Sequence, residues 1–410
     1  NFKRVFNFFN KILMSSDISY KVESRKLDRI NDATSELDDV EFLTIFIDLK
    51  ECFQNNDVEH ILNILIELSD YLYDENNLTP NITNFFIDNE LLPIISTLLV
   101  NPLKEEILKY VLKILNQLVH LSINDDLDFH IFLFQNGILK LLIDIRDTIP
   151  TDIISTYIHL VALFSFCSVE SRNFIIINFP QNLLESLIIE QGGFFISIQN
   201  ETSFLIWRMT MYPILDDDYI SDFIKWFIDF FSRSYLFFDI TSLRYWLFAL
   251  DNVIFEHDEI KPPMLITYGF HDIISFFIKT RNNSFDPKQL ENIENENYEE
   301  KRKEIFDQDK SQIDELLEII LKIVNLFVES GLEYVSFDII LALLDIANEN
   351  WKICSKLSII IIRLLIKKSK DVLLFNDIAN IQILLQIYDS AQYSFKYEIV
   401  FLLHEIISNA

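Results

Sequence analysis

Histidine and clustered aspartate are the side chains of this sequence that are best suited to acid–base or metal chemistry. Three consecutive acids, Asp216-Asp217-Asp218, follow Pro213 and offer the oxygen ligands that a metal ion uses. They also suit the start of a helix, where carboxylates face the positive end of the helix dipole, and we expect this role. The seven histidines are His60, His120, His130, His159, His257, His271 and His404. They form no HExxH motif or comparable ligand spacing, so we expect no bound metal.

Glycine and cysteine are both scarce. The five glycines among 410 residues fall far below the usual share of about 7%, and loops that bind phosphates or cofactors depend on glycine. The three cysteines, Cys52, Cys167 and Cys354, form no CxxC pair, which argues against a zinc site and a disulfide framework. We interpret them as buried apolar residues of a reducing compartment, the cytoplasm or the nucleus. We expect no cofactor and no enzymatic activity.

The net charge of the chain restricts its partners. With 34 basic and 63 acidic residues, the formal charge is −29. Such a charge repels nucleic acid and anionic membranes and favours a basic protein or peptide, although solvated helix faces alone also explain it. No apolar run reaches the 18 or so residues of a membrane span. We therefore expect no nucleic acid partner and no membrane insertion.

A polar corner followed by a short apolar helix recurs along the chain. The first corner is Asn89-Glu90, before "LLPIISTLL", and the next two are Asn136-Gly137 and Pro180-Gln181. The steps are 47 residues from 89 to 136 and 45 residues from 136 to 181. Gly269 marks a corner two steps of 44 residues further on, and Ile378 lies in the last one. The chain therefore contains an internal repeat.

Long helical runs lie between these corners. They cover residues 59–74, 104–122, 151–168, 201–214, 240–257, 314–330, 351–368 and 394–408. Their apolar residues recur at i, i+3, i+4 and i+7, as in Ile107, Tyr110, Val111, Ile114 and Leu118. A period of about 40 to 47 residues with two or three helices per unit is typical of armadillo and HEAT repeats. The sequence thus predicts an all-α, right-handed α-solenoid of about eight repeats with a long concave surface.

Two segments interrupt this pattern. Residues 1–40 are polar and mixed, with an amphipathic start, and we interpret them as a cap on the solenoid or as a separate arm. Residues 281–312 contain almost no apolar side chain, which predicts a charged insertion that is a loop or an exposed helix. The predicted solenoid covers residues 41–410 apart from that insertion.

Several stretches resemble repeats of importin-α, the armadillo adapter for nuclear localisation signals. Residues 72–99, "LYDENNLTPNITNFFIDNELLPIISTLL", are similar to the junction between its first and second repeats. "CSVESRNFIIINFPQNLLESLI", "LRYWLFALDNVIFEHDEI" and "LEIILKIVNLFVESG" resemble its third, a middle and a later repeat. The resemblance spans roughly residues 42–410. It implies an adapter in nuclear protein import that holds a basic, extended segment in its groove. If residues 1–40 form an arm, the resemblance also implies importin-β as a partner.

The resemblance implies a set of binding residues. Importin-α carries Trp-x-x-x-Asn on the inner helix of most repeats, and the i and i+4 positions share one face. The tryptophans hold the stems of Lys and Arg, while the asparagines bond the peptide backbone. No repeat here keeps the complete pair: Trp207 is followed by Met211, and Trp246 by Leu250. The candidate peptide-binding residues are Asn116, His120, Trp207, Trp246 and Asn325.

The absence of complete Trp-x-x-x-Asn pairs affects the function that we expect. In "HLVALFS" the two positions fall at His159 and Leu163, or at Val161 and Ser165. Without the pairs, we expect weak affinity for a simple lysine-rich signal. Two hypotheses follow: a divergent importin-α-like adapter for a basic or extended segment, or a structural armadillo scaffold of a larger complex with no transport role. The sequence identifies neither the partner nor the oligomeric state.

Overall fold

Helices make up nearly all of the regular structure. The computed structural model of the protein describes residues 35–72, 86, 90–124, 128–189, 195–211, 217–234, 238, 240–256, 310–329, 337–348, 352–369, 375, 377–391 and 393–409. Within these residues there are seventeen α-helices, one short 3₁₀ helix and no strand. The prediction of an all-α protein is confirmed.

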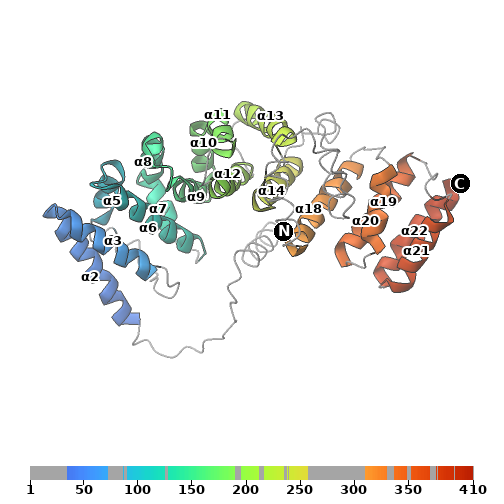
Figure 1. Ribbon diagram of the computed structural model, residues 1–410, viewed down its shortest axis with the longest axis horizontal. Coiled ribbons are helices and arrows are strands. Elements are labelled where there is room, and N and C mark those ends of the chain that lie inside the picture. The colour runs from blue at the N-terminus through green and yellow to red at the C-terminus, as the bar shows by residue number, and fades with distance from the viewer. Residues whose placement is uncertain are drawn as a thin grey trace.

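Eight helices form a row in which each packs against the next. These row helices are α3 (Val58–Leu72), α6 (Glu105–Asn124), α9 (Ile154–Phe164), α12 (Phe195–Met209), α14 (Ile240–Glu256), α18 (Lys310–Glu329), α20 (Lys352–Ser369) and α22 (Tyr393–Asn409). The flanking helices are α2 (Ser35–Gln54), α5 (Leu91–Val100), α7 (Phe129–Gln135), α8 (Ile138–Ile145), α10 (Val169–Asn178), α11 (Gln181–Ile189), α13 (Asp217–Ser234), α19 (Phe337–Asn348) and α21 (Ile378–Ser390). The described helices form an elongated array in which α2 and α22 lie at opposite ends (Figure 1).

The predicted helical runs and corners can be compared with these bounds. Each of the eight predicted runs overlaps one row helix. Helices α5, α8, α11 and α21 begin at or just after their predicted corners, at Leu91, Ile138, Gln181 and Ile378. Asp217 is the first residue of α13, as expected for an acid at a helix start. The corner at Gly269 lies outside the described residues.

The two predicted interruptions need corrected bounds. Helix α2 begins at Ser35, inside the stretch 1–40, and residues 1–34 lie outside the described part. Ser35 is followed by Glu36, Asp38 and Asp39, which suit a helix start because serine and acids favour the first turn. Helix α18 begins at Lys310, so only residues 281–309 of the insertion lie outside the described part.

The core runs as one cluster along the row. On α6, Ile107, Val111, Ile114 and Leu118 are almost completely buried and recur at helical spacing. Burial of one such side chain stabilises the fold by about 1.5–3 kcal/mol. None of the described helices combines the length and apolar composition that a membrane-spanning helix requires.

Two corners share an uncommon backbone conformation. Glu90 before α5 has φ 54°, and Gly137 before α8 has φ 83°, both in the left-handed region. Glycine enters this region without the steric cost that a Cβ atom brings. The same turn is therefore built twice, 47 positions apart. Gly137 adopts it without strain, whereas the backbone of Glu90 is strained there because it carries a Cβ atom.

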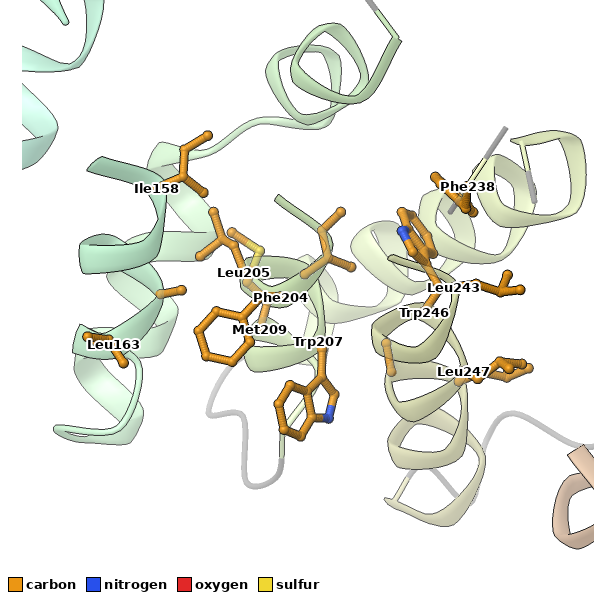
Figure 2. Packing of buried hydrophobic residues seen from close by; sticks show 14 of the residues in the cluster. Ile158, Leu163, Phe204, Leu205, Trp207, Met209, Phe238, Leu243, Trp246 and Leu247 are labelled. Carbon is orange, nitrogen blue, oxygen red and sulfur yellow. The ribbon is translucent and has the colours of Figure 1, made fainter. Parts of the chain in front are cut away.

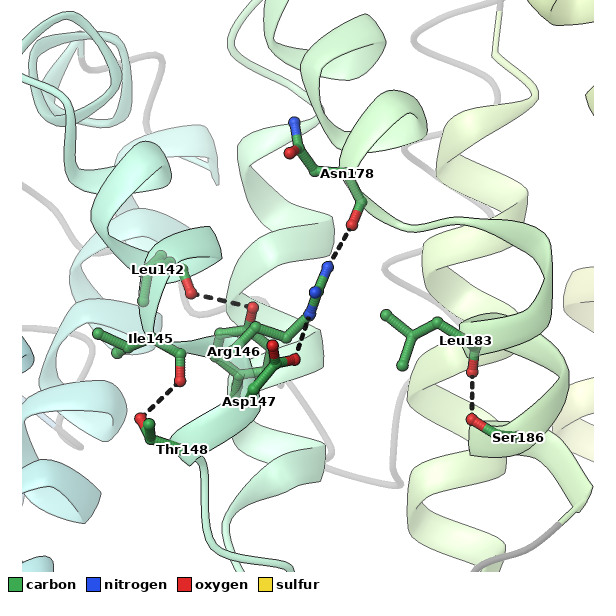
Figure 3. Close-up of polar contacts among 9 residues, drawn as sticks. Leu142, Ile145, Arg146, Asp147, Thr148, Asn178, Leu183 and Ser186 are labelled. Carbon is green, nitrogen blue, oxygen red and sulfur yellow. Dashed lines mark hydrogen bonds and ion pairs between the residues drawn. The ribbon is translucent and has the colours of Figure 1, made fainter.

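A polar junction follows the second corner (Figure 3). Arg146, directly after α8, donates from its guanidinium to the backbone oxygen of Asn178 at the end of α10, at 2.6 Å. It also contacts Asp147 at 2.9 Å, and this bond lowers the pKa of the Asp147 carboxyl. The Tyr157 hydroxyl on α9 donates to the backbone oxygen of Leu142 on α8 at 3.1 Å. The Arg146 bond joins two flanking helices, α8 and α10, and the Tyr157 bond joins α8 to the row.

We expect Gly137→Ala to lower the free energy of unfolding by about 1 kcal/mol. A Cβ at this position meets no neighbouring atom, so the cost comes from the left-handed backbone alone. Urea denaturation followed by circular dichroism measures it. Lys140→Ala, on the exposed side of α8, serves as the control and should change stability by less than half as much. Equal stability of Gly137→Ala and the parent protein would contradict the strained corner.

Candidate functional site

Hydrogen bonds connect side chains of one row helix to the next. We call them polar rungs, and each joins residues 39 to 48 positions apart, close to the period predicted from the corners. They are Gln117 Nε2 to Ser69 O (3.2 Å), Asn116 Nδ2 to Thr156 O (2.8 Å), His159 Nδ1 to Glu201 Oε2 (2.7 Å), Arg208 Nε to Ser165 Oγ (3.1 Å), Ser242 Oγ to Asn200 Oδ1 (2.6 Å), Trp246 Nε1 to Ser203 Oγ (3.0 Å), Asn252 Nδ2 to Thr210 Oγ1 (3.2 Å) and Lys368 Nζ to Glu329 O (3.1 Å).

Several rungs meet the C-terminal end of the preceding row helix. Gln117 donates to the backbone oxygen of Ser69 near the end of α3, and Lys368 donates to the last residues of α18. Asn252 donates to the Thr210 hydroxyl, which itself donates to the backbone oxygen of Trp207 at the end of α12. The last carbonyl groups of a helix have no partner within it. The rungs supply those partners and fix how adjacent row helices align.

The candidate residues Asn116 and His120 lie on α6. Asn116 is half-buried, and its Nδ2 makes a rung to α9 while its Oδ1 has no hydrogen-bond partner among the described residues. His120, one turn further along, is exposed. Their i, i+4 spacing puts both on one side of α6. They are the candidate pair that the structure brings together.

Trp207 on α12 does not form an open pocket. Only 4% of it is exposed, because Tyr245 and Phe248 of α14 cover its indole with ring centroids 5.6 Å and 5.3 Å away. Tyr245 and Phe248 are themselves half-buried and present the accessible aromatic surface. A ligand at this position would therefore contact the two rings of α14 before Trp207.

Trp246 is a core residue, which corrects its assignment to a binding surface. It has no exposed area and lies among Phe227, Phe231 and Phe238, with ring centroids 5.0, 5.3 and 5.0 Å away. Figure 2 shows the indoles of Trp207 and Trp246 pointing to different sides of their helices. The indole N–H of Trp246 makes a rung to Ser203. Burial on the side of α14 that faces the core removes this residue from any ligand.

Asn325 lies on α18, well separated along the chain from the other candidates. Its Nδ2 donates to Glu329 Oε1 at 2.9 Å, and its Oδ1 is buried with no hydrogen-bond partner among the described residues. Asn116 and Asn325 therefore share one property: each holds an unused amide acceptor on a row helix. Both oxygens are buried, so a ligand does not reach them in this conformation.

Two further groups on the row were not among the candidate peptide-binding residues, although His159 was one of two alternatives for the position that tryptophan takes in importin-α. His159 on α9 pairs with Glu201 on α12, and its ring stacks on Phe204 with centroids 5.4 Å apart. Tyr245 and Phe248 form the accessible aromatic surface described above. Their i, i+3 spacing on one helix was a usable signal.

Asp251 on α14 holds a buried carboxyl group that has no direct ion-pair partner among the described residues. Its Oδ1 is buried without a hydrogen-bond partner in the described structure. Desolvation raises the pKa of this carboxyl to about 6, and the positive charge of Lys322 on α18 opposes that rise. Lys322 is itself paired with Glu318 at 2.7 Å. An acid held in this way reduces stability at neutral pH, which is typical of residues kept for binding.

The row combines a histidine–carboxylate pair, two accessible aromatic rings and one desolvated acid. Such a set recognises peptide groups and aliphatic or cationic side chains. In the part of the chain that the structure describes, no three His, Cys, Asp or Glu side chains gather closely enough to hold a metal ion.

Comparisons with known proteins add no information about function to this geometry. No protein-family model matches the chain, and no curated protein matches it. Among solved structures, the crystal structure of an engineered protein is similar, with a TM-score of 0.42 and 10% sequence identity. The match covers 67% of this chain and 97% of the engineered protein.

We expect Asp251→Asn to stabilise the protein at pH 8 by roughly 2–3 kcal/mol, from 1.36 kcal/mol per pKa unit. The folded-state pKa of about 6 lies above the ordinary value of 3.8, so the folded protein holds this proton more tightly than the unfolded chain. The ionised carboxyl thus lowers the free energy of unfolding by its full amount above pH 6, and this loss disappears as the pH falls towards 4. The stability difference between the two proteins should follow the same course. Thermal unfolding at pH 4, 5, 6, 7 and 8 measures it, and a difference that does not vary with pH would contradict the buried acid.

Proposed function

We propose that this chain is an armadillo-like, right-handed α-solenoid of about eight repeats that binds a segment of another protein and catalyses no reaction. Three features support the solenoid: the unbroken row of long helices, polar rungs that join residues 39 to 48 positions apart, and a left-handed corner built twice at the same step. A stack of this kind offers a long surface on which an extended segment can lie.

The observation that carries the binding role is the accessible pair Tyr245 and Phe248 on a row helix. Both rings are half-buried and lie against Trp207, so they form a broad apolar surface that costs little entropy to hold in place. Rigid aromatic surfaces of this kind dominate the energy of protein interfaces.

A basic or extended segment is the ligand that we favour for this central part of the row. Glu201 on α12 pairs with His159, whose ring stacks on Phe204, and the ring of Phe204 lies 5.3 Å from that of Tyr245. A cation can pack on an aromatic face and pair with an acid at the same time. The chain would then act as a divergent relative of importin-α, in the cytoplasm or the nucleus.

A structural scaffold with no transport role is the second candidate, and the tryptophans favour it. Trp246 lies in the core and Trp207 lies beneath two rings of α14. The pockets that importin-α uses for lysine stems therefore have no counterpart at these two positions. Such a scaffold would bind a folded domain or a helix of a partner through the same rings.

We expect a labelled lysine-rich peptide to bind with a Kd on the order of tens of micromolar or weaker, equivalent to about 6–7 kcal/mol. Its affinity should fall further when the salt rises from 20 to 150 mM, because exposed charges are then screened. The variant Tyr245→Ala/Phe248→Ala should weaken binding at low salt about fivefold or more. Fluorescence anisotropy measures the Kd of the parent protein at both salt concentrations and the Kd of the variant at low salt.

Ile189→Ala provides the matched control. Ile189 lies on α11, outside the row, and is 58% exposed, so this variant should bind the peptide like the parent protein. Sub-micromolar binding that resists salt would contradict the loss of the tryptophan pockets. If the peptide does not bind at all at low salt, the adapter function is excluded and the structural scaffold is the remaining candidate.

A further inference from the structure

Helix α20 differs in charge from the rest of this acidic chain. It carries five basic residues and no acidic residue, whereas the chain has 63 acids against 34 bases. Several other row helices mix both signs: α6 has Glu105 and Glu106 beside two lysines, and α18 pairs Lys322 with Glu318. Solvated helix faces gain from such mixing, and α20 lacks it.

The basic residues of α20 lie on one side. Lys356, Arg363 and Lys367 are spaced by seven and four positions, which places them on one helix face about 16 Å long. Neighbours lie on both flanks of this face. Lys368 reaches the end of α18, and Arg363 pairs with Glu398 of α22 at 3.2 Å. We call the face formed by Lys356, Arg363 and Lys367 the basic face.

Two of these cations have no ion-pair partner among the described residues. Arg363 is neutralised by Glu398, and Lys368 binds backbone oxygens of α18. Lys356 is half-buried and Lys367 is exposed, and neither makes an ion pair with a described carboxylate. A ligand that approaches the basic face therefore meets two cations available for pairing, on either side of Arg363.

Apolar side chains border the basic face. The Arg363 guanidinium lies over the ring of Phe401 on α22, 5.5 Å from its centroid. Phe401 is 51% exposed, and Val400 and Tyr397 on the same helix are 48% and 50% exposed. Ile360, between Lys356 and Arg363, is half-buried. Accessible apolar groups thus lie directly beside accessible cations.

We propose that the basic face of α20, with the exposed apolar side chains of α22, binds an acidic amphipathic segment of a partner protein. Carboxylates spaced along the segment would pair with Lys356 and Lys367, while its apolar residues would cover Phe401 and Val400. Charge complementarity of this kind sets partner choice and the rate of encounter. A helix with acids on one side and apolar residues on the other meets both requirements.

A protein segment fits this surface better than nucleic acid does. A duplex carries a charge about every 1.7 Å, and the net charge of −29 on the chain would repel it over a long contact. A short acidic segment places only a few charges on the basic face, and its apolar side chains gain from the exposed rings. The surface is separate from Tyr245 and Phe248 and does not depend on the function proposed above.

The test uses the full chain and a fluorescein-labelled peptide of sixteen residues with Glu on one helical face and Leu on the other. In anisotropy at 50 mM salt this peptide should bind at least tenfold more tightly than its Glu→Gln version, and 150 mM salt should weaken it severalfold. Lys356→Glu/Lys367→Glu should reduce binding at least tenfold. Lys356→Arg/Lys367→Arg should retain it, and Ile189→Ala, on an exposed site of α11, should leave it unchanged.

Zero-length carbodiimide cross-linking gives a second measurement that needs no variant. It joins a peptide carboxylate to a lysine amine within contact distance, and mass spectrometry then locates the joined lysine. We expect Lys356 and Lys367 to be the main sites. Cross-links only at Lys109 or Lys113 of α6, or equal affinity for the Glu and Gln peptides, would overturn the proposal. A labelled twenty-nucleotide oligothymidine provides a further comparison. If it bound more tightly than the Glu peptide, and if Lys356→Glu/Lys367→Glu abolished that binding, the proposal would be overturned in favour of nucleic acid.

Discussion

The row helices are apolar on more than one side, and a single neighbour cannot cover all of that surface. On α14, Leu243, Trp246, Leu250 and Val253 are buried, and the helix packs against α12, α13 and α18. Removing any one of these neighbours would return large apolar side chains to water, at about 25 cal/mol for each Å² exposed. Each helix pair is therefore stable only inside the stack, which explains why the core runs along the row as one cluster.

Apolar contact alone does not fix how one row helix aligns with the next, because dispersion forces tolerate a slide better than hydrogen bonds do. The polar rungs provide that alignment. Ser203 receives the indole N–H of the buried Trp246, and Ser242 donates to Asn200 one helix back. A slide of one turn would leave these groups buried without partners, at a cost of about 1–3 kcal/mol each. As a consequence, the two residues that each rung joins are always 39 to 48 positions apart in the sequence.

The sequence predicted the row helices and the four corners within the described residues well, because both depend on local signals. Helical periodicity located α6, and the polar corner located the start of α8 at Ile138. It did not predict which side of each helix stays accessible. A helix with three covered sides is apolar nearly all round, so the pattern around Trp246 does not separate the core side from the open side. Tyr245, one position away, lies half-buried and against Trp207, and only tertiary packing distinguishes the two.

Net charge is also a weak guide to what any one row helix binds, for a related reason. Neighbouring helices lie about 8–10 Å apart, and salt screens charges over about the same distance at physiological strength. A bound segment therefore senses the charges of the helix beneath it and of the next one on each side, but little of the whole chain. Helix α3 carries Glu59, Glu67 and Asp70 and no lysine or arginine, whereas α20 carries only cations. Six steps along the row separate them, so an acidic helix and a basic helix act independently. The charge of −29 determines how copies of the chain repel one another, and the local sequence of each row helix determines what it can bind.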